Sequence, residues 1–174
     1  MAGLSLGCAA EEASPWPAGA SPPFELEVLK AQRQLRVLSA GSVIAQYPIG
    51  LGFQPRGDKV RQGDGATPEG EYRVCIKNPQ SRYYLSLGLT YPNARDAARG
   101  RAAGLLSPAE EQSILQALER GHCPPWNTPL GGEIFLHGRG SATDWTLGCI
   151  ALDDPHMKVL FHNIDVGARV TIRP

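Results

Sequence analysis

Apolar and polar residues alternate along several short stretches of the chain, and this alternation is typical of β-strands with one buried face. The clearest stretches, each bounded by turn residues, predict strands at Phe24–Leu29, Gln34–Ser39, Ser42–Gly50 and Glu71–Asn78. Nearer the C-terminus, EIFLHG, TLGCIAL and ARVTIRP predict three more strands, and residues 81–89 are a weaker candidate of the same kind. The chain is therefore expected to be rich in strands.

Helical patterns are few. Ser107 precedes PAEEQSILQALERG, which combines an N-cap serine, a proline, acidic residues in the first turn and Gly121 at the end. A second short helix is predicted to begin at Asp154, whereas residues 91–104 are expected to be a loop with some helix. Because strands do not alternate regularly with helices, we expect a mainly β domain with one or two short helices and not a parallel α/β sheet.

The 174 residues are enough for one domain with its own core. Residues 1–23 are rich in Pro, Ala and Ser and are expected to be a disordered N-terminal tail, which leaves residues 24–174 as the folded domain. Within the tail, LSLGC resembles a lipid-attachment motif with its cysteine at Cys8, but a basic region and a long apolar region do not precede it. Lipid attachment at Cys8 therefore stays open. No stretch is long enough for a transmembrane helix.

Charge and cysteine content narrow the functional classes further. Lys and Arg together number 17, as do Asp and Glu, and this balance argues against a general nucleic-acid binder. Cys75 and Cys123 could form a disulfide or remain two separate buried thiols, and the sequence leaves both open. His122 beside Cys123 lacks a second ligand pair at zinc-ribbon spacing, so no metal site is predicted. GDGATPEG lacks the Lys-Ser/Thr of a phosphate-binding loop and is expected to be a tight turn.

The segment Ile134–Leu152 contains the residues best suited to chemistry. It places His137 and Cys149 each beside a glycine and each on or next to a short apolar run. A thiol becomes a strong nucleophile when an imidazole within hydrogen-bond reach takes its proton, so we expect a thiolate–imidazolium pair at neutral pH. The neighbouring glycines allow backbone amides to point at a developing oxyanion.

Three segments together resemble the L,D-transpeptidase catalytic domain family (YkuD-type) of bacterial cell-wall enzymes: YPIGLG, then GDGATPEGEYRV, then LHG followed by TLGCIAL. The resemblance extends over roughly residues 24–174 and implies an L,D-transpeptidase-like β-sandwich or barrel with its cysteine in a groove. It implies that Cys149 is the nucleophile and His137 the general base. It also implies that the Gly138 carbonyl orients the imidazole, and that amides at Gly148 and Cys149 form the oxyanion hole.

The chain departs from the family pattern at two positions near the cysteine. Leu147 stands where members often have a histidine, and Ala151 stands where many have an arginine. These differences place some contacts to the donor peptide in doubt. Arg139, or an arginine elsewhere, is expected to supply the missing positive charge.

Aromatic residues near the two motifs are candidates for the walls of a substrate cleft. Tyr83, Tyr84 and Trp145 are expected to contact substrate, although strand alternation should turn some of residues 81–84 toward the core. Trp126, in a proline-rich loop, is a candidate for a lid over the site.

The function implied by the resemblance is an L,D-transpeptidase that acts on peptidoglycan stem peptides through a cysteine acyl-enzyme. It would release D-alanine and form cross-links. Alternatives are an L,D-carboxypeptidase or an endopeptidase using the same site, or a non-catalytic cell-wall binding module. We expect no cofactor and no metal, stem peptides and not nucleic acid as partners, a monomer, and a location in the bacterial cell envelope.

Overall fold

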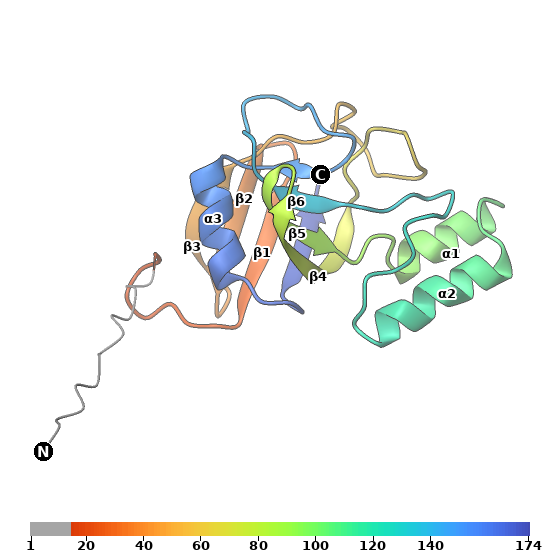
Figure 1. Cartoon of the computed structure of the whole chain (residues 1–174), viewed down its shortest axis with the longest axis horizontal. Coiled ribbons are helices and arrows are strands. Elements are labelled where there is room, and N and C mark those ends of the chain that lie inside the picture. Colours follow the sequence, from red (N-terminus) through yellow and green to blue (C-terminus); the bar gives the residue numbers. More distant parts are fainter. Residues whose placement is uncertain (1–14) are drawn as a thin grey trace, which may run out of the picture.

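The computed structural model describes residues 15–174, so Cys8 and its lipid-attachment motif lie outside the described residues. Eight strands form one sheet in the order β3-β2-β1-β8-β4-β5-β6-β7 (Figure 1). The strands are β1 Phe24–Leu29, β2 Gln34–Ser39, β3 Ser42–Pro48, β4 Gly70–Ser81, β5 Tyr84–Leu89, β6 Phe135–His137, β7 Ile150–Ala151 and β8 Arg169–Arg173. The helices are α1 Ala94–Ala102, α2 Pro108–Glu119 and α3 Asp154–Asn163. Over this part of the chain, no helix has both the length and the apolar character needed to cross a membrane.

Neighbouring strands run antiparallel except for two parallel pairs, β1 with β8 and β6 with β7. Alternate residues of β1, β2 and β8 point into one apolar core, as the sequence pattern predicts. Met157 and Leu160 of α3 complete this core and are inaccessible to solvent. The mainly β fold expected from the sequence is therefore confirmed.

The helices α1 and α2 lie side by side, away from α3 (Figure 1). They share a smaller apolar cluster formed by Ala97, Leu106, Ile114 and Leu130. The helix predicted after Ser107 is confirmed, with a capping box between Ser107 and Glu110. Residues 91–104, expected to be largely loop, contain α1, because Asn93 and Asp96 form a second capping box. Within residues 15–174 the fold thus has three helices, where the sequence predicted one or two.

Several predicted strands have different lengths in the structure; for example, Ser42–Gly50 ends at Pro48 and EIFLHG is reduced to Phe135–His137. The strand predicted at Glu71–Asn78 runs from Gly70 to Ser81. The predicted strand TLGCIAL is reduced to the two residues of β7. It is shortened because Gly148 has a positive φ of 134° and the chain before it forms a turn. The nucleophile candidate therefore lies just before a strand and not within one.

Two further features concern the edges of the domain. Trp16, which the sequence assigned to the tail, is only 5% exposed and packs edge-on against Phe24 at a ring-centroid distance of 4.4 Å. Cys75 and Cys123 form a disulfide, with 5.2 Å between their Cα atoms, and this decides between the two readings that the sequence left open. The disulfide joins β4 to the loop that follows α2.

Candidate active site

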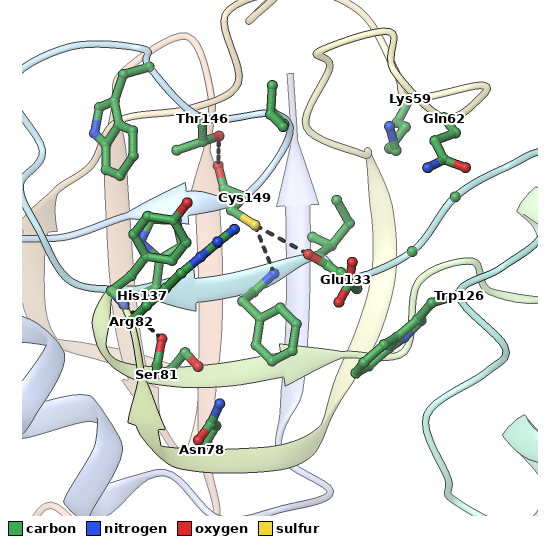
Figure 2. A pocket seen from close by; sticks show the side chains of 18 of the residues that line it. Lys59, Gln62, Asn78, Ser81, Arg82, Trp126, Glu133, His137, Thr146 and Cys149 are labelled. Carbon is green, nitrogen blue, oxygen red and sulfur yellow. Dashed lines mark hydrogen bonds between the residues drawn. The ribbon is translucent and has the colours of Figure 1, made fainter.

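Cys149 is the free thiol among the described cysteines, and its sulfur faces a pocket of about 810 Å³. The sulfur accepts a hydrogen bond from the Phe135 amide at 3.4 Å and donates one to the Glu133 carbonyl at 3.3 Å (Figure 2). Phe135 is the first residue of β6 and Glu133 lies two residues before it, so the start of this strand and the chain leading into it hold the sulfur in place.

A turn from Thr146 to Cys149 fixes the backbone of the nucleophile. The Thr146 hydroxyl donates to the Cys149 carbonyl at 2.7 Å and accepts from the Gly148 amide at 3.1 Å. Gly148 cannot be replaced without strain, because a Cβ at that position would lie 2.8 Å from the Ala66 carbonyl oxygen. Ala66 belongs to the GDGATPEG turn, so this second sequence motif packs directly against the cysteine turn.

The YPIGLG motif holds the other end of the same loop. Leu51 accepts a hydrogen bond from the Thr146 amide, and its own amide donates to Asp144. Asp144 also forms a bidentate ion pair with Arg33, with 2.7 Å between Nη2 and Oδ2. Burial opposes ionisation of Asp144, but these hydrogen bonds outweigh it and hold the pKa of the carboxyl below its ordinary value. The three sequence motifs therefore meet around the cysteine.

His137 lies at the end of β6 and is 3% exposed. Its Nδ1 lies 2.7 Å from the carbonyl oxygen of Gly138. A carbonyl oxygen can only accept a hydrogen bond, so Nδ1 bears the proton and Nε2 of the neutral ring is free to accept one. Tyr83 stacks on the imidazole with 4.8 Å between centroids, and Trp145 meets it edge-on at 5.4 Å.

The strand register brings His137 and Cys149 to one face. β6 and β7 pair in parallel with Leu136 opposite Ile150 and His137 opposite Ala151. Side chains alternate along a strand, so His137 projects to the same side as Ala151, and Cys149, two residues earlier, shares that side. Both residues line the pocket. In this structure the sulfur's hydrogen bonds go to Phe135 and Glu133 and not to His137.

The protonation of the pair differs from the sequence expectation. Burial raises the pKa of the Cys149 thiol to about 11, and the nearby Glu133 carboxylate adds to the rise. Burial also lowers the pKa of His137 below its ordinary value, which the hydrogen bond to Gly138 only partly offsets. Both shifts favour a neutral thiol beside a neutral imidazole at pH 7. Both shifts therefore run against the thiolate–imidazolium pair expected from the sequence.

The two backbone amides expected to form the oxyanion hole, those of Gly148 and Cys149, differ in whether they already make a hydrogen bond. The Gly148 amide is used by the Thr146 hydroxyl. Within residues 15–174, the amide of Cys149 makes no hydrogen bond. Only the second of the two predicted donors is thus available to a reacting group.

Of the four residues predicted to contact substrate, two line the pocket and two do not. Tyr83 and Trp145 line the pocket. Tyr84 does not, because its ring packs against the apolar core. Arg139 is exposed and outside the pocket lining; its amide donates to Asp154, and its backbone has a positive φ of 80°. The structure instead places Arg82 in the wall, with its guanidinium 5.0 Å from the centre of the Tyr83 ring.

Several pocket residues have no counterpart in the motifs read from the sequence. Lys59, Gln62 and Glu133 line the side of the pocket away from His137, together with Trp126, the predicted lid residue (Figure 2). Glu133 is the first residue of EIFLHG, and at that position it has the pattern of a polar residue at the start of a strand, which does not indicate a site. In the described part of the chain, no group of three or more His, Cys, Asp or Glu residues could hold a metal ion.

The protein is a mainly β domain in which a free cysteine and a histidine line the same pocket. The L,D-transpeptidase catalytic domain family (YkuD) matches residues 23–172, and the chain belongs to this family. The resemblance read from the three motifs is thereby confirmed. Members of the family are cysteine-based transpeptidases related to peptidoglycan.

Individual relatives agree with this assignment. The candidate L,D-transpeptidase YafK of Escherichia coli K12 is 44% identical over an alignment of 89 positions, with coverage of 45% of this chain and 34% of that protein. The chain thus spans about a third of the length of the curated relatives it matches. The helical cell shape determining protein Pgp2 of Campylobacter jejuni has a similar structure, with TM-score 0.60, 23% identity, and coverage of 86% of this chain and 47% of that one. An L,D-transpeptidase from Xylanimonas cellulosilytica gives TM-score 0.53 at 16% identity, covering 91% and 64%. These two structures are similar in fold.

Proposed function

We propose that this chain is an L,D-transpeptidase that acts on peptidoglycan stem peptides through an acyl-enzyme on Cys149. One observation supports the proposal above all. A free thiol just before β7 and a histidine at the end of β6, with an unprotonated Nε2, line one pocket. A nucleophile, a base and an orienting group on the base are the components of covalent acyl transfer.

In the first step, Cys149 attacks the carbonyl of the third stem residue, and His137 Nε2 takes the thiol proton as the C–S bond forms. Because the resting pair is neutral, the proton moves with the attack and not before it. The Sγ–H now directed at the Glu133 carbonyl must turn toward His137 for this transfer. The Cys149 amide stabilises the oxyanion, since the Gly148 amide is held by Thr146.

The tetrahedral adduct collapses when the C–N bond to the terminal D-alanine breaks. His137 gives its proton to the leaving amine, and a thioester remains on Cys149. An amine from a second stem then attacks the thioester and forms a cross-link. If water attacks instead, the same site acts as an L,D-carboxypeptidase and releases a tripeptide.

Arg82 is the residue we propose for the charge that Ala151 does not provide. Its guanidinium lies in the pocket wall on the same side as His137 and Tyr83 (Figure 2). A planar guanidinium is suited to the terminal carboxylate of a donor peptide. Tyr83 and Trp145 would pack against the peptide beside it. A substrate of this kind places the protein in the bacterial cell envelope.

The test is incubation with a defined tetrapeptide muropeptide, followed by mass spectrometry of the products. We expect a cross-linked dimer and free D-alanine. Cys149→Ala should give neither, and His137→Ala should slow product formation strongly. His162→Ala, an exposed histidine at the end of α3, is the matched control and should behave as wild type.

The other outcomes separate the remaining functions. Tripeptide without dimer would indicate the carboxypeptidase. Cleavage only in intact sacculi would indicate an endopeptidase. Full turnover by Cys149→Ala would contradict the proposed nucleophile, and no product from any substrate would favour a binding module.

A further inference from the structure

Glu133 contacts the nucleophile through its backbone, and its side chain lines the same pocket. Its carbonyl oxygen accepts the hydrogen bond from Cys149 Sγ at 3.3 Å, so its backbone lies directly against the sulfur. Its side chain is exposed and lines the pocket. The carboxylate is close enough to the thiol to act on it electrostatically. The Glu133 side chain therefore lies on one side of the pocket, near the sulfur (Figure 2).

The backbone at Glu133 is in the left-handed region, with φ of 54°. Such a conformation costs a non-glycine residue roughly 1–2 kcal/mol, and it is concentrated at functional sites. Glycine would adopt it without strain, and Gly131 and Gly132 immediately precede it. A glutamate at this position therefore favours a role for its side chain.

The Glu133 carboxylate has no ion-pair partner among residues 15–174. Lys59, the cation on the same side of the pocket, is paired with Asp64 at 2.8 Å. The other exposed charge of the pocket wall is Arg82, which comes from the opposite side of the sulfur (Figure 2). The pocket therefore presents a cation on one side of the nucleophile and an unpaired anion on the other.

We propose that Glu133 forms the acceptor site, where it binds the ammonium group of the amine that resolves the thioester. This inference rests on the proposed function and assigns its second substrate. The ammonium gives one proton to the Glu133 carboxylate, and the resulting amine attacks the thioester carbonyl. As the C–N bond forms and the C–S bond breaks, the second proton passes through His137 to the departing sulfur. The products are an amide, a neutral thiol and a protonated Glu133, which returns its proton to water.

The experiment compares two nucleophiles on the same acyl-enzyme. One is the side-chain amine of a purified stem peptide, which is cationic at neutral pH, and the other is hydroxylamine, which is largely uncharged there. The ratio of the two aminolysis rates is measured by mass spectrometry for wild type, Glu133→Gln, Glu133→Asp and Glu119→Gln. Glu119 is an exposed acid at the end of α2, away from the pocket.

Glu133→Gln should lower the amine-to-hydroxylamine ratio by about tenfold or more, because a charged hydrogen-bond partner is lost. Glu133→Asp should recover part of it, and Glu119→Gln should leave it unchanged. An unchanged ratio in Glu133→Gln, or an equal loss for both nucleophiles, would overturn the proposal.

A second measurement keeps this inference separate from the proposed function. If wild type forms no thioester, the proposed function fails. Acceptor binding is then tested by calorimetric titration of the amine-bearing stem into Cys149→Ala and Cys149→Ala/Glu133→Gln. About tenfold weaker binding to the double variant would support the acceptor site, and equal binding would overturn it.

Discussion

The hydroxyl of Thr146 is expected to fix the conformation of the nucleophile, and Thr146→Val tests this directly. Valine has nearly the same shape as threonine, so the change removes two hydrogen bonds and little packing. The Gly148 amide and the Cys149 carbonyl lose their partner at a residue that is only 4% exposed. Leaving a buried polar group unpaired costs about 1–3 kcal/mol, so the two together should cost about 2–6 kcal/mol.

This loss should lower the melting temperature by at least about 4 °C, since about 1 kcal/mol shifts Tm by about 2–4 °C in a chain of this size. It should also release the Gly148 amide and slow acylation of Cys149 by a stem peptide. Thr146→Ser keeps the hydroxyl and should restore acylation and most of the stability. The assays are scanning calorimetry and the rate of acyl-enzyme formation. Thr146→Val with wild-type values for both would refute the role of this turn.

Three further predictions follow from charges and covalent links. Acylation should stay active below pH 6.5, because the pKa of His137 is lowered and the ring stays neutral there. The rate of Cys149 alkylation by iodoacetamide should keep rising toward pH 11, because the pKa of the thiol is raised. An alkylation rate that levels off near pH 9 would contradict the raised pKa. Cys75→Ser/Cys123→Ser opens a link of sequence separation 48 and should cost about 2–4 kcal/mol in urea unfolding, and an unchanged midpoint would argue against the disulfide. Asp144→Asn breaks a partly exposed ion pair with the β1–β2 turn and should cost about 1 kcal/mol at low salt and less at high salt; no salt dependence would contradict the pairing.

The sheet could be predicted well because its strands are amphipathic. Strands β1 and β2 have the predicted bounds, and in both the apolar positions face the core. The order of strands could not be read from the pattern, because alternation gives each strand a buried face without naming its neighbour. The parallel pairing of β1 with β8 joins the two ends of the domain and has no local sequence feature.

Local exceptions arose where backbone geometry overrides the apolar pattern. TLGCIAL is apolar enough for a strand, but Gly148 and the Thr146 hydroxyl turn the chain before Cys149. Similarly, α1 was underestimated because its sequence contains few apolar residues, whereas its start is set by polar capping at Asn93. Trp16 was assigned to the tail by composition, and a single buried indole among Pro and Ser residues gave no periodic pattern.

The candidate site was partly accessible to sequence reasoning. His137 and Cys149 stood out because each adjoins a glycine at the end of an apolar run, and the structure places both in one pocket. Arg82 was only one of residues 81–84 expected near a substrate cleft, and Glu133 was not predicted at all, because their roles depend on which loops meet across the pocket. The protonation state predicted for Cys149 and His137 differs from the one the structure favours, because burial, which the sequence does not reveal, is the main cause of both pKa shifts.

The most direct test of the account is the intact mass of the protein quenched during turnover of a tetrapeptide stem. The account predicts an added mass equal to the stem without its terminal D-alanine, located by peptide mapping to Cys149 and absent in Cys149→Ala. Product formation with no adduct on Cys149, or an adduct on another residue, would contradict it.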